Sequence, residues 1–308
     1  MELVQTAVEF VLGASLALTV FAYSMRARRS DFLFFLTERR LLLISLLSIF
    51  ALSPMVAIAI IEWVEPPLVV RVAIASMSIS IIPPLLPWKQ LKDKGDRNYA
   101  IGLTLVVSIL AVGVVPATAD LLGRVSNHPY GVPPGEIASY VLMIVLLPTA
   151  LGIAFGYRFK EFSNRVAVPL ARFAGIATLV AVGVVLVSVA RDLPDVIGTR
   201  TLIAFFLFNL IALGIGHLLG GPNPERAVVL GLSSASRHPA VAITIASVNY
   251  PGERFTAAVM LCVAVNMAVT TPYLHWQMKK REQRDQLEES ERPAPDDVSP
   301  EQAGTGQA

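Results

Sequence analysis

The sequence Ser233-Ser234-Ala235-Ser236-Arg237-His238-Pro239 lies in the middle of an apolar stretch, residues 227–248, that is long enough to cross a membrane. Two of its residue types are unusual in such a place. Proline removes a backbone hydrogen bond and clashes with the preceding helical turn, and arginine at the centre of a spanning helix costs about 2.5–3.5 kcal/mol on insertion scales. The stretch therefore predicts an interrupted membrane helix that carries a charge at mid-membrane.

The same spacing of serine and proline occurs twice in the chain. The pattern Ser-x-Ser-x-x-Pro is formed by Ser234, Ser236 and Pro239, and again by Ser78, Ser80 and Pro83, after which Pro84 and Pro87 follow. Serine hydroxyls can bind the carbonyl groups that a broken helix frees. We therefore expect both segments to be unwound, with Pro83, Pro84 and Pro239 as the structural helix breaks.

The composition of the whole chain agrees with a membrane location. Of 308 residues 54% are hydrophobic and only 16% are charged, and the mean hydropathy is +0.62, whereas a soluble domain carries roughly 25% charged residues. The single cysteine, Cys262, excludes disulfide frameworks and thiolate metal clusters. A net charge of +2 is too small to indicate a polyanionic partner such as nucleic acid. The sequence predicts an all-α polytopic membrane protein.

A spanning helix needs about 20 mostly apolar residues, and nine stretches meet that length. They are Leu3–Tyr23, Leu41–Ile61, Leu68–Trp88, Tyr99–Leu122, Ile137–Tyr157, Ala167–Val189, Thr201–Leu219, Ala227–Val248 and Phe255–Trp276. We therefore predict nine transmembrane helices, of which the third and the eighth are interrupted.

The two interrupted spans occupy matching positions if the chain divides near residue 130 into four and five spans, because each is then the penultimate span of its half. The third and the eighth span are five positions apart, an odd number, so the two copies face the membrane in opposite directions. Interrupted segments at matching positions of inverted halves indicate the binding site of a secondary transporter. We expect a membrane transporter domain over residues 1–277, with a first repeat over about 1–125 and a second over about 136–277. Residues 278–308 are predicted to be a disordered cytoplasmic tail.

The orientation follows from the basic residues in the loops. Nineteen of the 25 Lys and Arg residues fall on the side that holds the carboxyl terminus, five fall on the opposite side, and Arg237 lies inside a span. This bias predicts a multi-pass protein of the cell membrane with the amino terminus outside and the carboxyl terminus in the cytoplasm.

Arg237 is the most informative residue, because no Asp or Glu lies near the centre of any predicted span. Its partners should be backbone carbonyls, helix carboxyl termini or an anionic substrate. Two interpretations stay open: a fixed tether between half-helices, or contact with substrate. His238 can likewise be a proton carrier or a neutral hydrogen-bonding group. The candidate substrate-binding residues are Arg237, His238, Ser234, Ser236, Ser78, Ser80 and Asn266.

The missing intramembrane carboxylates argue against paired-aspartate proton antiport and against a carboxylate sodium site, although the amides of Asn209 and Asn266 could form a weak one. No nucleotide-binding loop, nucleophile elbow or metal spacing occurs, so we expect neither an enzyme nor a bound cofactor. Gly152 and Gly156 form a Gly-x-x-x-Gly pair that predicts close packing of helices.

With these features the chain resembles the bile acid:sodium symporter family, from about residue 2 to residue 277. The Leu-rich segment Leu41–Pro54 resembles an early helix of that family, and Leu230–Thr244 resembles its second crossing helix. The resemblance implies a panel domain, a core domain, and solute bound beside two crossed, unwound helices. It also implies alternating access and organic anions carried together with sodium.

The chain departs from the family pattern at the sodium site. Where the family has a Glu-x-x-x-Gln-Asn stretch, this sequence places Ser233, Arg237 and His238, and Pro83-Pro84-Leu85 stands in place of a Pro-Gly-Gly turn. The family's sodium ligands are therefore expected to be replaced in this chain and no metal ligand is predicted, which leaves sodium coupling open. The hypothesis is that the Arg237 guanidinium replaces the bound cation.

The sequence thus predicts a secondary transporter of a small organic anion in a lipid bilayer, with no nucleic acid and no obligate protein partner. One alternative is an efflux carrier for a neutral or oxyanion solute, against which the position of Cys262 in the last span counts. Another is a non-transporting receptor or sensor on the same scaffold. An intramembrane enzyme that uses His238 has no paired acid or metal set to support it.

Overall fold

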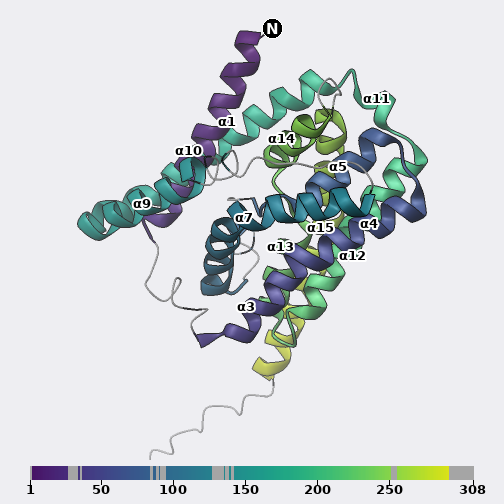
Figure 1. Ribbon diagram of the computed structural model, residues 1–308. Helices are drawn as coiled ribbons and strands as arrows, with labels where there is room; N and C mark the ends of the chain where they lie inside the picture. The colour runs from purple at the N-terminus through teal and green to yellow at the C-terminus, as the bar shows by residue number, and fades with distance from the viewer. Residues whose placement is uncertain are drawn as a thin grey trace, which may run out of the picture.

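The computed structural model describes residues 2–26, 34, 37–83, 86–87, 90, 95–126, 135, 139, 142–250 and 255–290. Within these ranges every regular element is a helix, as predicted (Figure 1). In chain order the helices are α1 (Glu2–Ser24), α3 (Arg39–Leu46), the π-helical turn η1 (Leu47–Leu52), α4 (Ser53–Val64), α5 (Leu68–Ile79), α7 (Arg97–Ser126), the π-helical turn η2 (Leu142–Leu146), α9 (Leu147–Arg158), α10 (Lys160–Val189), α11 (Leu193–Val196), α12 (Thr199–Leu219), α13 (Pro224–Ala235), α14 (Pro239–Asn249) and α15 (Thr256–Ser290).

Six helical segments are long and apolar enough to cross a membrane. They are Arg39–Val64, Arg97–Leu121, Lys160–Val189, Thr199–Leu219, Pro224–Asn249 and Thr256–Arg284. The other three predicted spans correspond to shorter apolar helices, Gly13–Ser24, Leu68–Ile79 and Leu142–Arg158. The multi-pass character is therefore confirmed, whereas the count of nine spans stays a prediction.

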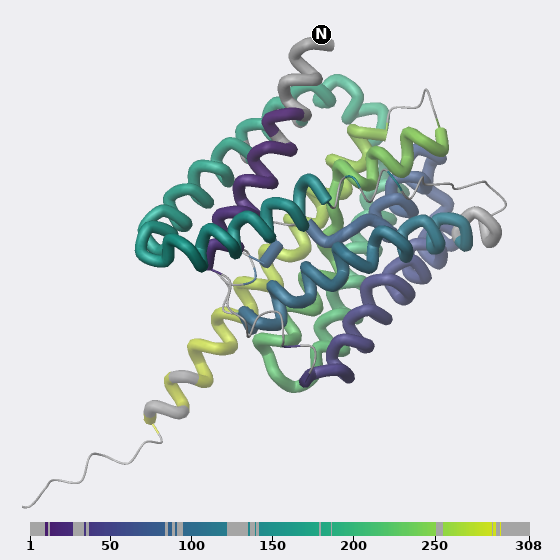
Figure 2. The backbone as a smooth tube through the Cα atoms, turned by 60° about the vertical axis from the view of Figure 1, so that its left-hand side comes forward, coloured from purple at the N-terminus to yellow at the C-terminus, as the bar shows by residue number. Residues whose placement is uncertain are grey.

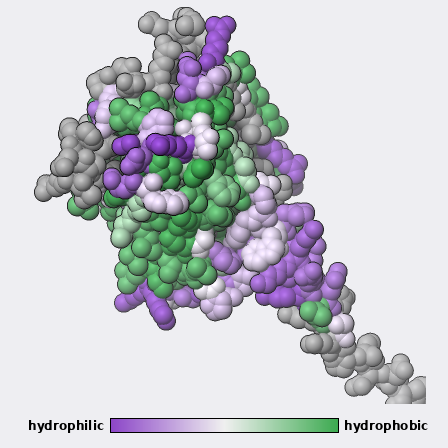
Figure 3. Space-filling view, turned by 90° about the vertical axis from the view of Figure 1, so that its right-hand side faces the viewer, coloured by the Kyte–Doolittle hydropathy of each residue, from purple (hydrophilic) through white to green (hydrophobic). Residues whose placement is uncertain are grey.

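The surface is also typical of a membrane protein. Large apolar side chains are exposed along α10, among them Phe173, Ile176, Val180 and Val187. Hydrophobic side chains cover much of the face in Figure 3, whereas hydrophilic ones gather toward the end of α15. Apolar patches of this extent are suited to contact with lipid.

The helices pack as two groups. The smaller group consists of α1, η2, α9 and α10, with α1 lying alongside α10 in both views (Figures 1 and 2). The larger group contains α3, η1, α4, α5, α7 and α12 to α15, and its core is formed by buried side chains such as Tyr99, Phe205, Phe208, Ile74 and Leu230. The cavity described below lies between the two groups.

Glycine allows close packing inside the smaller group. A Cβ atom added at Gly152 would lie 2.5 Å from the carbonyl oxygen of Phe21, and one added at Gly156 would overlap the carbonyl of Met25. The backbones of α1 and α9 can approach this closely only because both residues lack a side chain. The packing role predicted for this pair is confirmed.

Both predicted helix interruptions are present, with boundaries that differ from the expected ones. Helix α5 ends at Ile79, so it does not continue to residue 88, and Ser80 already has an extended backbone with ψ 163°. Pro239 begins α14 and so does not interrupt a turn, because at the first position of a helix its missing N–H has no partner to lose. Pro83 lies in the irregular segment after α5, and Pro84 lies outside the described residues.

The prediction of disorder from residue 278 onward is wrong for residues 278–290, because α15 continues to Ser290. Two contacts hold its polar end. The guanidinium of Arg281 forms an ion pair with Glu225 at 2.6 Å, and the ammonium of Lys280 lies 5.3 Å from the ring centroid of Trp276. Residues 291–308 of the predicted tail lie outside the described residues.

Candidate functional site

The link between α13 and α14 crosses the irregular segment that follows α5. Ser236 and His238 have extended backbones, and the backbone N–H of His238 donates a hydrogen bond of 2.9 Å to the carbonyl of Ile81. The two Ser-x-Ser-x-x-Pro segments, far apart in the sequence, are therefore in direct contact. We refer to this contact, residues 80–83 with residues 236–238, as the crossing.

Arg237 is the centre of the crossing and is only 3% exposed. Its Nη1 donates to the carbonyl of Ser80 at 3.2 Å, and its Nη2 donates to the carbonyl of Ile49 at 2.8 Å. Among the described residues its Nε has no hydrogen-bond partner, and no carboxylate forms an ion pair with it. One guanidinium thus joins η1, the end of α5 and the α13–α14 link, which fits the tether interpretation.

The carbonyl of Ile49 is available because of a proline. Ser53 N–H, the donor that would serve Ile49 in an α-helix, donates instead to Ser48 in the π-helical turn. The next residue is Pro54, which has no N–H to give. A helical carbonyl without a backbone donor needs another partner when it is buried, and the guanidinium of Arg237 supplies one.

His238 caps a helix. Its Nδ1 accepts a hydrogen bond of 3.5 Å from the backbone N–H of Val241, in the first turn of α14. A ring nitrogen that accepts in this way carries no proton in this conformation, as expected for the neutral hydrogen-bonding group. The ring is 3% exposed.

The two serines predicted in the first copy bind carbonyls of their own helix. The hydroxyl of Ser78 donates to Ala75 at 2.7 Å, and that of Ser80 donates to Met77 at 3.0 Å. Both residues are fully buried. The expectation that serine hydroxyls bind the last carbonyls of a broken helix is confirmed for α5.

The serines of the second copy instead contact other segments. The hydroxyl of Ser234 lies 2.7 Å from that of Ser48 in η1. Ser233 accepts from the side-chain amide of Gln90 at 2.9 Å, and the same amide donates to the carbonyl of Val229. Gln90 was not singled out in the sequence, because a lone Gln between Lys89 and Leu91 gives no signal of a buried partner.

Asn266 and Ser236 come together at the end of α13. The amide of Asn266 donates to Asn209 Oδ1 at 2.8 Å and to the carbonyl of Ala235 at 3.1 Å. The hydroxyl of Ser236 donates to Asn266 Oδ1 at 3.4 Å. All seven predicted substrate-binding residues are thus at most 8% exposed, and each makes hydrogen bonds within the protein.

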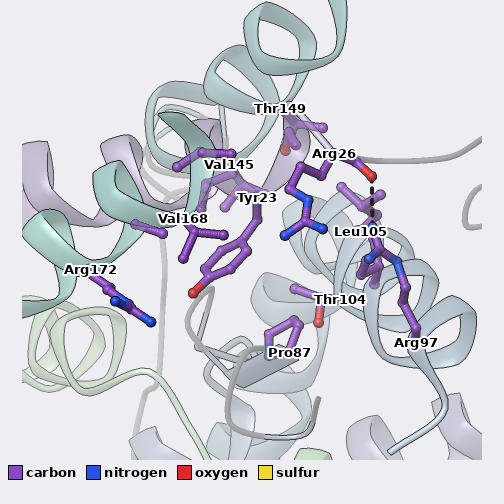
Figure 4. Close-up of a pocket in the computed structure, with 16 residues that line it drawn as sticks. Tyr23, Arg26, Pro87, Arg97, Thr104, Leu105, Val145, Thr149, Val168 and Arg172 are labelled. Carbon is purple, nitrogen blue, oxygen red and sulfur yellow. Dashed lines mark hydrogen bonds between the residues drawn. The ribbon is translucent and has the colours of Figure 1, made fainter. Parts of the chain in front are cut away.

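A cavity of about 280 Å³ lies elsewhere, between the two groups of helices (Figure 4). Helices α1 and α10 and the η2–α9 segment contribute to one side, and α7 with Pro87 contributes to the other. The lining residues are Val20, Ala22, Tyr23, Ser24, Arg26, Pro87, Arg97, Ile101, Thr104, Leu105, Val145, Thr149, Ala167, Val168, Ala171 and Arg172. Pro87 belongs to the segment that follows the break in α5.

Three arginines give this cavity its charge. Arg26, Arg97 and Arg172 line it, and no Asp or Glu is among its described lining residues. Figure 4 shows the Tyr23 ring between the side chains of Arg172 and Arg26. Arg97 Nη2 donates to the carbonyl of Arg26 at 2.8 Å, which connects α7 to the end of α1. Sequence reasoning treated these arginines as loop charges only, since nothing local shows that three separate segments meet.

The described residues contain no group of three or more His, Cys, Asp and Glu side chains that could hold a metal ion. Two polar features of the described residues are thus candidates for a functional site: the buried, hydrogen-bonded crossing and the arginine-lined cavity.

Apolar helices that cross a membrane, two interrupted helices in contact and a cavity between two groups of helices are features of a membrane transporter. The chain belongs to the Sodium Bile acid symporter family, which matches residues 14–194. Members of this family are transporters, not enzymes, and the membership indicates a transporter of the bile acid symporter kind. No curated protein matches the chain.

The matched region contains every residue that lines the cavity. It ends before α12, so the segment Leu230–Thr244, on which much of the resemblance rested, lies outside it. The match is therefore shorter than the expected range of residues 2–277, and Arg237 is not covered by it.

Proposed function

We propose that the chain is a secondary transporter that carries a small organic anion across the cell membrane by alternating access. The observation that carries the proposal is the cavity between the two groups of helices, with Arg26, Arg97 and Arg172 on its wall. A planar guanidinium binds carboxylate or sulfonate oxygens through two parallel hydrogen bonds. Three guanidinium groups on the wall of one cavity favour an anionic solute.

The rest of the wall indicates the body of the solute. Val20, Leu105, Val145 and Val168 provide apolar surface, which suits a hydrocarbon body attached to the anionic group. The volume of about 280 Å³ lies just below the range of roughly 300–1,000 Å³ that is usual for ligand sites. A compact amphipathic anion fits these dimensions better than a large one.

The position of the cavity supports alternating access. Its walls come from both groups of helices, so a movement of one group against the other changes its shape. We identify α1, η2, α9 and α10 with the panel domain and the larger group with the core domain. The contact between the two interrupted helices supports the inverted repeat, with halves over about 1–125 and 136–277 in a nine-span layout.

The loop charges indicate how the chain is oriented in the membrane and to which side the cavity opens. Arg26, Arg97 and Arg172 all lie on the side that holds most of the basic residues, and such residues concentrate on the cytoplasmic side. We infer that the amino terminus is outside and that this conformation opens its cavity toward the cytoplasm.

The proposal is tested with the full-length protein in two steps. A thermal-shift screen of organic acids of graded size identifies a ligand, because a compound that binds the folded form stabilises it. Uptake of that compound is then measured in proteoliposomes. Saturable uptake that Arg172→Gln weakens and Arg165→Gln leaves unchanged is the expected result, Arg165 being an exposed arginine outside the cavity.

Two other outcomes contradict the proposal. Saturable binding without flux would make the chain a receptor on the same scaffold. Uptake of neutral solutes or inorganic oxyanions in preference to organic anions would support the efflux carrier instead.

A further inference from the structure

We propose that the guanidinium of Arg237 is a permanent, covalently attached cation of the crossing, and that it takes the place of an exchangeable sodium ion. Transport would then proceed without sodium, although the family is named for it. The inference deepens the proposed function and rests on it for the transport step, but its structural part can be tested without any transport.

The first argument is the chemistry of the atoms around the guanidinium. Its two partners are backbone carbonyl oxygens, those of Ser80 and Ile49, at 3.2 and 2.8 Å. Carbonyl oxygens are also the groups with which proteins coordinate alkali cations. A guanidinium and a sodium ion therefore compete for the same oxygens, and in this chain the guanidinium holds them.

The second argument is electrostatic. Ser80 directly follows the last turn of α5, where the helix dipole presents partial negative charge. A cation at this position is favourable, and the side chain of Arg237, which is only 3% exposed, provides it. No acidic side chain among the described residues pairs with it, so this dipole and the carbonyls supply the compensation.

The third argument is that the Asn266 and Ser233 side chains beside the crossing are already engaged in hydrogen bonds. Asn266 Oδ1 accepts from Ser236, and Asn209 Oδ1 accepts from Asn266. The hydroxyl of Ser233 accepts from Gln90. The oxygens Ser53 Oγ, Ser76 Oγ and Gln90 Oε1 have no partner among the described residues. A sodium ion that used the oxygens of Asn266, Asn209 or Ser233, however, would have to break existing hydrogen bonds. These engaged oxygens therefore do not fit sodium as well as the two carbonyls fit the guanidinium.

The functional consequence concerns energy coupling. A dissociable cation can be bound on one side of the membrane and released on the other, whereas a side chain stays with the protein throughout the cycle. The crossing of this chain is thus fixed in its cation-occupied form. The solute gradient, with the membrane potential, would drive transport.

The test begins with thermal unfolding of the purified full-length protein in sodium chloride and in choline chloride at equal ionic strength. We expect the same Tm in both salts for the native chain. For Arg237→Ala we expect a Tm lower by about 5 °C or more in choline chloride, because two buried carbonyls lose their donor. Sodium or guanidinium ions should restore part of that loss, since the vacated carbonyls can then bind a free cation.

Arg165→Ala is the matched control and should respond to neither ion. If Arg237→Ala does not fold, Arg237→Lys can be used instead, because it keeps a cation at this position. The comparison of the native chain in the two salts then still decides whether sodium binds. A Tm of the native protein that rises specifically with sodium, or an Arg237→Ala variant as stable as the native chain in choline, would overturn the proposal. The salt comparison stays informative even if no anion is transported, and equal anion uptake in both salts is the expected result if one is.

Discussion

Arg97 and Arg26 are joined across the cavity, since the Nη2 of Arg97 donates to the carbonyl of Arg26 at 2.8 Å. The bond connects the first turn of α7 with the end of α1, and thus the larger group of helices with the smaller one. This bond is exposed to solvent, so its contribution to stability is modest compared with the buried hydrogen bonds of Arg237.

The first prediction concerns the charge of the cavity. Arg172→Gln should weaken the binding of an organic anion about tenfold, the loss expected for one charge-assisted hydrogen bond. Arg172 is the best choice because it is an exposed residue of α10 that lines the cavity, and its removal leaves the Arg97–Arg26 bond intact. Isothermal titration calorimetry checks this, with Arg165→Gln as the control; equal affinity in both variants would exclude Arg172 from the site.

The second prediction separates the two roles of His238. His238→Asn should preserve stability and transport, because Asn is among the best residues for capping a helix amino terminus. His238→Ala should lower the free energy of unfolding by about 1 kcal/mol. Thermal unfolding and proteoliposome uptake are measured together. A proton carrier would behave differently, because both variants would then lose transport to the same extent.

The third prediction concerns the amide pair beside the crossing. Asn266→Ala should lower the free energy of unfolding by about 1–2 kcal/mol, since Asn209 Oδ1 and the Ala235 carbonyl lose their donor. Asn164→Ala is the control, at an exposed position on α10. Chemical denaturation in detergent gives the comparison, and the account of this cluster fails if the two variants are equally stable.

The fourth prediction concerns packing in the smaller group. Gly156→Ala should destabilise the protein by about 1–3 kcal/mol, the usual effect of overpacking, because its Cβ would overlap the Met25 backbone. Gly175→Ala in α10 meets no atom within 4 Å and should be neutral or slightly stabilising. The Tm of both variants checks this. An unchanged Tm for Gly156→Ala would show that α1 and α9 can separate freely.

The fifth prediction concerns Pro54. Pro54→Ala introduces a backbone N–H that can donate to Ile49 and thus competes with Arg237. We expect a lower Tm, although replacing proline by alanine within a helix is normally stabilising. Pro116→Ala is the control, because Pro116 lies inside α7 and no described side chain donates to the carbonyl of Val112, four residues earlier. A higher Tm in both variants would contradict the role of the freed carbonyl.

Local chemistry explains which features the sequence could predict. The helix interruptions, the helical class and the suitability of Gly152 and Gly156 for close packing follow from residue types that act on their own or neighbouring turns. The end of α5 at Ile79 was placed too late, because the span was judged by apolar length although its serines can already satisfy the last carbonyls. The polar end of α15 was missed because Arg281 is held by Glu225, a partner far away in the sequence.

In the candidate sites, too, some residues could be identified from the sequence and others could not. Arg237 could be identified from its cost in a membrane, but its partner Ile49 sits in an ordinary apolar run, and only the π-helical turn with Pro54 makes its carbonyl available. The cavity could not be predicted, because Arg26, Arg97 and Arg172 come from three helices whose meeting depends on the tertiary fold.

The hydrogen bonds by which Arg237 joins three segments have a mechanical consequence. In the proposed transport cycle, residues 49, 80 and 237 should move together, and the surface along which the two groups of helices move should lie elsewhere. We expect the cavity to open along the boundary that the exposed bond between Arg97 and Arg26 spans.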